Sequence, residues 1–217
     1  MQRRDFTLRS AAVLALPALS LGPARAQSKP PEEGIDFVKL DKRLSSEAPQ
    51  GKIDVIDFFW YSCPHCNAFE PKLEAWIKRL PGDVVLRRVP VAFRDSFVPQ
   101  QRLFYALEAL GKVEELHRKV FYAIHVERQA LDNQERITDW MEKQGQDKAK
   151  FLELYSSFAV QTKARRAAQL QNDFKVQGVP SLGIAGRFYT DGSLAGTMDR
   201  ALLVTDYLIA EARRNKS

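Results

Sequence analysis

The chain is poor in cysteine, since Cys63 and Cys66 are the only two among its 217 residues. Small proteins that use disulfides as staples usually carry several pairs. A bridge between residues three apart closes a very small loop, and the stabilisation from a disulfide grows with the length of that loop. The pair is therefore better explained by chemistry than by a structural role.

Long hydrophobic runs are missing as well. The most apolar stretch, residues 11–21, is shorter than the about 20 residues that a membrane-spanning helix needs, and Pro17 interrupts it. A basic start with Arg3 and Arg4 comes before this stretch, and an Ala-Arg-Ala cleavage pattern at residues 24–26 comes after it. These features predict a signal peptide over residues 1–26 rather than an uncleaved anchor.

The first residues also bear on the export route. Residues 3–8 read Arg-Arg-Asp-Phe-Thr-Leu, which resembles a twin-arginine (Tat) signal. An ordinary Sec signal that happens to hold two adjacent arginines is the alternative. Both readings predict export, and we expect the protein in the periplasm.

The chain also lacks a large excess of positive or negative charge. The formal charge of the whole chain is +6, and residues 1–26 hold four arginines and one aspartate, so the exported part carries +3. No stripe of Lys and Arg with interleaved aromatic residues is present. We therefore expect no nucleic-acid partner.

Ligands for a metal or a haem are too few. A structural zinc site needs four ligands, and the chain offers one cysteine pair. His117 and His125 lie eight residues apart on a predicted helix, where we expect partly exposed side chains. Covalent haem attachment needs a histidine directly after the second cysteine, and Asn67 occupies that position. We expect no metal, and no cofactor beyond a redox-active Cys63–Cys66 disulfide.

The cysteine pair lies between a predicted strand and a predicted helix. Residues 53–59 are β-branched and aromatic, as in a buried strand, with Asp54 expected to point to solvent. Pro64 fits the first turn of a helix, and apolar residues recur at helical spacing over 67–79. Residues 84–91 form the next strand, which completes a right-handed βαβ unit.

The remaining elements place a helical block inside a β-rich domain. Residues 35–40 predict a short first strand, and residues 182–189 predict a hairpin with a glycine turn. Five amphipathic helices precede that hairpin, and a helix over 201–212 follows it. The expected fold class is α/β, a βαβ…ββα arrangement with a mixed central sheet. We expect this domain to comprise residues 27–97 and 172–217, with an inserted helical domain at 98–171.

A helix start beneath Cys63 has a chemical consequence. Unpaired N–H groups and the positive end of the helix dipole would face its sulfur and favour the thiolate, so its pKa should fall. His65 can add a positive charge, and Pro64 begins the helix. A thiolate is both the attacking species and the better leaving group in disulfide exchange. Cys66, one turn on and facing inward, can open or close the bridge.

Two further positions carry hypotheses. Asp57 either points to solvent or lies beneath the active site near Cys66, where burial would raise its pKa and let it move a proton. The spacing alone does not separate these alternatives. Pro180 opens a strand after Val179, and a cis bond there would mark a shaped site.

Together these residues resemble the DsbA-type thiol:disulfide oxidoreductases of the thioredoxin superfamily. The resemblance rests on the helical insertion and on two motifs, Phe58-Phe59 followed by Cys63-Pro64-His65-Cys66, and Gly178-Val179-Pro180-Ser181. It implies a thioredoxin fold, with Cys63 as the exposed nucleophile, Cys66 as the resolving thiol and Pro180 as the cis-proline. It also implies a buried acid at Asp57, where family members usually carry glutamate.

The implied reaction is donation of the Cys63–Cys66 disulfide to reduced, newly exported proteins by a monomer that a DsbB-type membrane quinone reductase reoxidises. Trp60 and Pro180 would contact extended substrate, whereas we expect Phe59 in the core. A periplasmic reductase of the same fold is one alternative. A thioredoxin-fold chaperone whose cysteines are incidental is another.

Overall fold

The computed structural model describes residues 29–214. Its strands are β1 (Val38–Lys39), β2 (Ile53–Phe59), β3 (Val84–Pro90), β4 (Ser181–Ile184) and β5 (Phe188–Asp191). Its α-helices are α1 (Pro64–Ile77), α2 (Val98–Ala109), α3 (Val113–His125), α4 (Gln134–Lys143), α5 (Lys148–Ser156), α6 (Phe158–Asp173) and α7 (Met198–Arg214). The predicted signal peptide lies outside the described residues.

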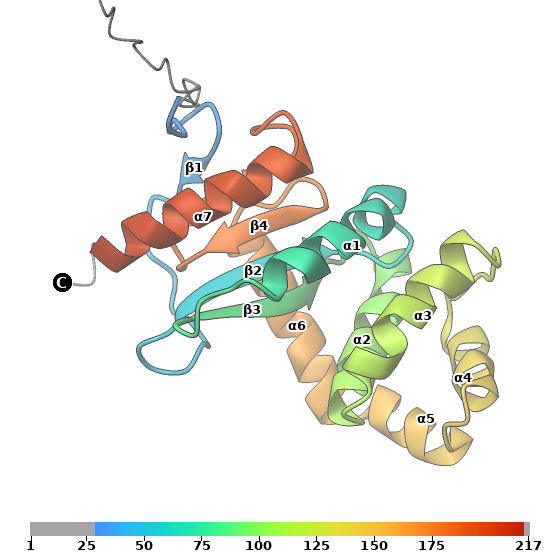
Figure 1. The fold of residues 1–217 in the computed structure, drawn as a ribbon. Coiled ribbons are helices and arrows are strands. Elements are labelled where there is room, and N and C mark those ends of the chain that lie inside the picture. Colours follow the sequence, from blue (N-terminus) through green and yellow to red (C-terminus); the bar gives the residue numbers. More distant parts are fainter. Residues whose placement is uncertain (1–28, 215–217) are drawn as a thin grey trace, which may run out of the picture.

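The five strands form one mixed sheet in the order β1-β5-β4-β2-β3. Strand β2 pairs in parallel with β3 and antiparallel with β4, and all seven of its residues are buried. Its β-branched and aromatic side chains suit such a position. Strand β1 joins β5, so the N-terminal and C-terminal parts complete one sheet (Figure 1). The predicted thioredoxin fold with a helical insertion is confirmed.

Helices α1 and α7 cover one face of the sheet (Figure 1). Because successive side chains of a strand point to opposite faces, Ile53, Val55 and Asp57 of β2 share this face. Leu73 of α1 and Leu208 of α7 belong to the same buried cluster as Val55. Asp57 therefore points toward the helix that begins at the cysteine pair.

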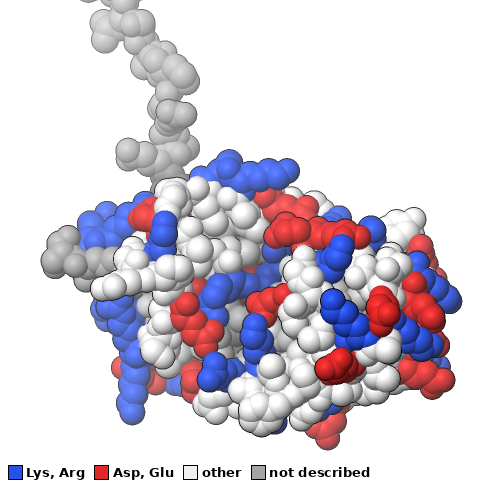
Figure 2. All heavy atoms as spheres, turned by 90° about the horizontal axis from the view of Figure 1, so that it is seen from below, with Lys and Arg blue, Asp and Glu red and all other residues white. Residues whose placement is uncertain are grey.

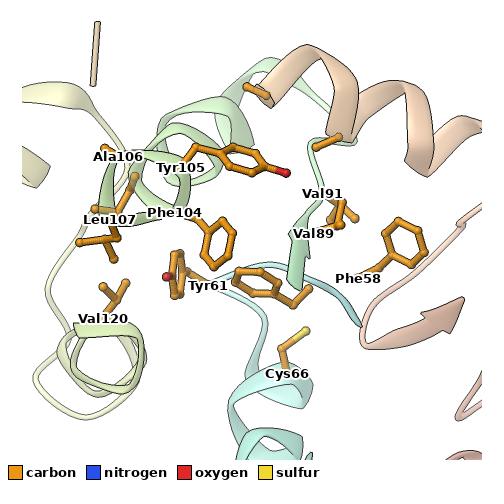
Figure 3. Close-up of a cluster of buried hydrophobic side chains, with 14 of the residues drawn as sticks. Phe58, Tyr61, Cys66, Val89, Val91, Phe104, Tyr105, Ala106, Leu107 and Val120 are labelled. Carbon is orange, nitrogen blue, oxygen red and sulfur yellow. The ribbon is translucent and has the colours of Figure 1, made fainter. Parts of the chain in front are cut away.

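The opposite face packs against the insertion, helices α2 to α6. Phe58 of β2 meets Phe174, which follows α6, with ring centroids 5.3 Å apart. Gly183 of β4 permits this approach, since a Cβ there would lie 2.6 Å from the Phe174 ring. The same cluster reaches Leu107 of α2 and Cys66 of α1 (Figure 3). The insertion thus builds half of the core.

Two details differ from the sequence predictions. The first strand is shorter than residues 35–40, because a turn in which Gly34 N–H donates to Phe37 O comes before it. Asp54 is buried rather than exposed, with 2% of its surface accessible. Arg87 Nε and Nη2 donate to the two oxygens of Asp54 at 2.9 and 2.7 Å, which compensates the buried charge.

The surface carries mixed charge. Figure 2 shows a face on which Lys and Arg side chains are interspersed with Asp and Glu. A cavity of about 610 Å³ between β3 and the insertion is lined by both signs, among them Arg87, Arg88, Glu108 and Lys163. None of the helices within residues 29–214 combines the length and apolar character needed to cross a membrane.

Candidate active site

Cys63 caps the N-terminus of α1, which begins at Pro64. The backbone N–H of Cys66 donates to Cys63 Sγ at 3.4 Å. Proline has no N–H to leave unpaired in the first turn, so Pro64 suits this helix start. A tight turn leads into the helix, and in it Cys63 N–H donates to Trp60 O at 3.0 Å. The local sequence thereby places one sulfur at the positive end of the helix.

The two thiols, both free in this structure, differ in acidity. The hydrogen bond from the Cys66 thiol lowers the pKa of Cys63 to about 6 against its partial burial, and the Cys66 and His65 N–H groups and the His65 charge assist. Burial raises the pKa of Cys66 far above its usual range, and Cys63 beside it adds to that rise. Figure 3 shows the Cys66 side chain pointing from α1 toward the buried cluster. At neutral pH the reduced pair is a Cys63 thiolate beside a Cys66 thiol.

Cys63 is less exposed than the resemblance implied, with 7% of its surface accessible. Val179 lies against it, and Cys63 Sγ, when protonated, donates to Val179 O at 3.4 Å. The Val179–Pro180 peptide bond is cis. Val179 is half-buried and Pro180 is buried, whereas Pro64 and His65 are exposed. The loop before β4 therefore covers one side of the sulfur and leaves the helix start open.

Side chains of the insertion hold the residues just before Cys63. Gln100 Oε1 accepts from Ser62 N–H at 3.1 Å, and Gln100 Nε2 donates to Ser62 Oγ at 2.7 Å and to Leu131 O at 3.0 Å. His125 Nε2 lies 2.8 Å from Tyr61 O. The sequence reasoning missed Gln100, and it gave His125 no function. The spacing of residues in the sequence could not reveal either role. Gln100 and His125 bind backbone groups and one short side chain of residues that are distant from them in the chain.

His117 corrects a prediction. We expected a partly exposed helix histidine, but 3% of His117 is accessible, and its Nδ1 lies 2.9 Å from the Tyr61 hydroxyl. Burial lowers the pKa of His117, so the imidazole is neutral at pH 7. A signal was present, because His117 lies three and four residues before Val120 and Phe121, on the apolar face of α3.

Asp57 lies beneath α1, with 1% of its surface accessible. Burial raises its pKa to about 8, the Glu70 charge adds to the rise, and Arg88 opposes it. The Asp57 charge in turn helps to raise the pKa of Cys66, so the two groups are neighbours. Of the two alternatives, burial beneath the active site is the observed one.

Glu70 and Arg88 complete the buried polar group. Glu70 follows Cys66 by one turn of α1, and Arg88 of β3 is the strand partner of Asp57. Arg88 Nη2 donates to Glu70 Oε1 in a short contact, and His117 Nε2 lies 3.4 Å from the same oxygen without hydrogen-bond geometry. The sequence reasoning named neither residue as part of the site.

Trp60 and Phe59 differ in exposure. Phe59 is 1% accessible and contacts Phe104 and Phe121, so it is a core residue, as expected. Trp60 is half-buried and stacks on Phe97 with ring centroids 3.7 Å apart. A substrate role for Trp60 stays a prediction.

A metal would find no ligand set here. Within residues 29–214 no group of three or more His, Cys, Asp or Glu side chains is arranged to hold an ion. The disulfide chemistry of Cys63 and Cys66 needs none, since the electrons move between sulfur atoms.

Comparisons with known proteins agree with this geometry. Residues 54–203 match the model of the DSBA-like thioredoxin domain. The chain is 42% identical to the thiol:disulfide interchange protein DsbA of Bordetella parapertussis, over 99% of this chain and 100% of that protein. It is 38% identical to the Burkholderia cepacia protein of the same name, over 91% and 93%.

Solved structures give the same result. The crystal structure of Pseudomonas aeruginosa DsbA superposes with a TM-score of 0.80 at 37% identity, covering 84% of this chain and 95% of that one. That of DsbA from Xylella fastidiosa gives 0.78 at 29% identity, covering 85% and 98%. The chain belongs to the DsbA family, and it is a thiol:disulfide oxidoreductase.

Proposed function

We propose that the protein is a periplasmic disulfide oxidase that donates its Cys63–Cys66 disulfide to reduced exported proteins. The observation that carries this proposal is the position of Cys63 Sγ at the start of α1, where it accepts a hydrogen bond from the Cys66 N–H. A Cys63 thiolate stabilised at the start of α1 favours the reduced form of the pair. A stabilised reduced form makes the disulfide a ready acceptor of electrons.

The reaction begins when a substrate thiolate attacks Cys63 Sγ. The Cys63–Cys66 bond breaks, a mixed disulfide forms, and Cys66 leaves as a thiolate in a buried position where charge is unfavourable. A second substrate thiolate then attacks the substrate sulfur of the mixed disulfide. Cys63 leaves as a thiolate, and the substrate departs oxidised with both protein cysteines reduced.

Asp57 supplies the proton that the leaving Cys66 needs. Its carboxyl is buried beside Cys66, and with a pKa of about 8 it is protonated at neutral pH. A general acid with a pKa near the working pH is well matched to proton transfer. Pro64 and His65 tune the site from the start of α1, and Val179 and Pro180 tune it through the cis peptide whose Val179 O lies 3.4 Å from Cys63 Sγ.

The proposed partners are those that the family resemblance implies. Reduced exported proteins take the disulfide, extended substrate lies near Trp60 and Pro180, and a DsbB-type membrane quinone reductase reoxidises the pair. The protein acts as a monomer, exported by the signal at residues 1–26 through the Tat or the Sec route. The thioredoxin-like part comprises residues 27–97 and 172–217, and the insertion comprises 98–171.

Two cysteine variants test the proposal. With Cys63→Ser, oxidation of a reduced client protein should fall to the uncatalysed rate. With Cys66→Ser the nucleophile remains but no internal disulfide can form, so the Cys63 thiolate should attack a disulfide of an oxidised client, release one client thiolate and remain trapped as a mixed disulfide. If Cys63→Ser left client oxidation unchanged, the proposed oxidase function would be wrong, and the result would favour a chaperone role.

A further inference from the structure

Two buried carboxyl groups lie near one guanidinium beneath α1. Asp57 and Glu70 are 1% and 2% accessible, and the Arg88 side chain is 14% accessible. Asp57 and Arg88 are strand partners of a parallel pair, so their side chains lie on the same face of the sheet, the face that α1 covers. Two negative charges and one positive charge in a buried site are unfavourable, and one of the carboxyls therefore holds a proton.

Hydrogen bonding decides which carboxyl holds the proton. Glu70 accepts from Arg88 Nη2, and His117 Nε2 approaches it to 3.4 Å. Both oxygens of Asp57 are buried without any partner. A buried charge without hydrogen bonds is strongly unfavourable, so the charge belongs on Glu70 and the proton on Asp57.

Arg88 also has one hydrogen-bond donor without a partner. Its Nε is buried and unpaired, while Nη2 is engaged by Glu70. A buried donor without a partner is uncommon in a folded protein and calls for an explanation. The unpaired donor of Arg88 and the unpaired acceptors of Asp57 lie on the same face of adjacent strands.

Apart from the Cys63 thiolate of the reduced protein, the other buried titratable groups next to Asp57 are neutral at pH 7. Burial raises the pKa of Tyr61, which stands beside His117, and burial lowers the pKa of His117 on α3. Cys66 on α1 is a thiol when reduced, because burial raises its pKa. On the neighbouring strand β4, the residue opposite Asp57 is the apolar Leu182. The charge balance at Asp57 is therefore set by Glu70 and Arg88.

We propose that Glu70 and Arg88 are positioning residues that switch Asp57 between acid and carboxylate. Glu70 engages Arg88 at rest and keeps Asp57 a neutral acid. When Asp57 gives its proton to the leaving Cys66 sulfur, the Arg88 Nε–H stabilises the new carboxylate. Asp57 regains a proton from water before the next cycle. This inference rests on the proposed role of Asp57 in disulfide donation.

The variant Glu70→Gln tests the first half of the switch. Glutamine keeps the size and an oxygen for Arg88 but removes the charge, so Arg88 should pair with Asp57 and ionise it. In the reduced protein, a ¹³C NMR titration should show the pKa of Asp57 falling by more than one pH unit. Client oxidation at pH 7 should slow at least about twofold, because a fall of one pH unit in a pKa of about 8 lowers the protonated fraction of the acid from about 0.9 to about 0.5. Glu74→Gln, at a half-exposed position one turn further along α1, is the matched control and should change neither quantity.

The double variant Glu70→Gln, Arg88→Met tests the second half. With no cation left, Asp57 should recover a pKa near that of the unmodified protein, because burial alone then acts on it. Simple damage to the fold would grow with the second substitution instead of being reversed. An unchanged Asp57 titration in Glu70→Gln, or no recovery in the double variant, would overturn the inference. Because this titration uses no substrate, it stands apart from the Cys63→Ser test of the proposed function.

Discussion

At the scale of single residues, the site depends on how each ionisable group is solvated. Cys63 stands at a helix start and Cys66 in a buried cluster, so two cysteines three residues apart have opposite pKa shifts. The motif alone predicted the direction for Cys63. It could not predict the burial of Asp54 or Asp57, because burial there depends on side chains supplied by distant elements.

The first prediction concerns the pH dependence of stability. The pKa of Cys63 is about 6 when folded, below its usual value near 9, so ionisation stabilises the folded reduced protein most above pH 9. This contribution falls as pH drops from 9 through 6. The melting temperature of the reduced form should therefore rise relative to the oxidised form between pH 6 and pH 9. Melting curves of both forms check it, and a constant difference over that range would contradict it.

A second prediction concerns Asp57→Asn. The folded pKa of about 8 lies above the usual Asp value, so this group favours folding less and less as pH rises from about 4 to 8. Removing it should stabilise the protein by a few kcal/mol at pH 7, on the order of its pKa rise, and by much less at pH 4. Client oxidation should slow by about 100-fold, the usual contribution of a general acid. Urea unfolding at both pH values and stopped-flow oxidation measure these effects.

If Asp57→Asn changed the free energy of unfolding by the same amount at pH 4 and at pH 7, a buried protonated carboxyl at this position would be excluded. If stability changed as expected but oxidation did not slow, Asp57 would be buried without serving as the acid.

At the scale of elements, close packing decides where the sequence pattern is informative. Composition predicted β2, whose β-branched and aromatic residues are buried on both faces, and the sequence pattern also predicted β3, the five helices of the insertion and the closing hairpin. It overestimated the first strand, where a turn replaces pairing. It gave no sign that the ring of Phe174 lies over Gly183, since that contact joins the insertion to β4.

Gly183→Ala tests this contact. The new methyl group would lie 2.6 Å from the Phe174 ring, which is itself buried against Phe58. We expect a loss of about 1–3 kcal/mol in the free energy of unfolding, the usual effect of overpacking. Gly82→Ala is the control, because nothing lies within 4 Å of its added Cβ, and its change should stay within about 0.5 kcal/mol. Equal effects of the two substitutions in denaturant unfolding would show that the contact is not tight.

At the scale of the whole molecule, the insertion and the thioredoxin-like part build the active site together. Gln100, His117 and His125 of the insertion hold Ser62 and Tyr61, the residues just before the nucleophile. The sequence predicted that a helical block interrupts the domain. It could not predict that this block shapes the active-site loop, because those contacts span more than 30 residues of chain.

Gln100→Leu tests the role of the insertion. It leaves Ser62 N–H and Leu131 O without their partner, which should destabilise the protein by about 1–3 kcal/mol. It should also move the thiolate titration of Cys63, followed by ultraviolet absorbance, because the loop that places the sulfur is released. Gln101→Leu is the matched control, as it removes a buried bond to Pro90 O from the same helix without touching the loop. If both variants left the Cys63 titration unchanged, the insertion would support the fold but not the site.

The central claim is that the structure stabilises the reduced pair and so makes the disulfide a donor. The equilibrium of Cys63–Cys66 with glutathione tests it most directly, because it compares the two redox forms against a known couple. We expect the pair to be largely reduced in a glutathione mixture that leaves ordinary structural disulfides intact. A pair that stayed oxidised in that mixture would contradict it and identify the protein as a reductase.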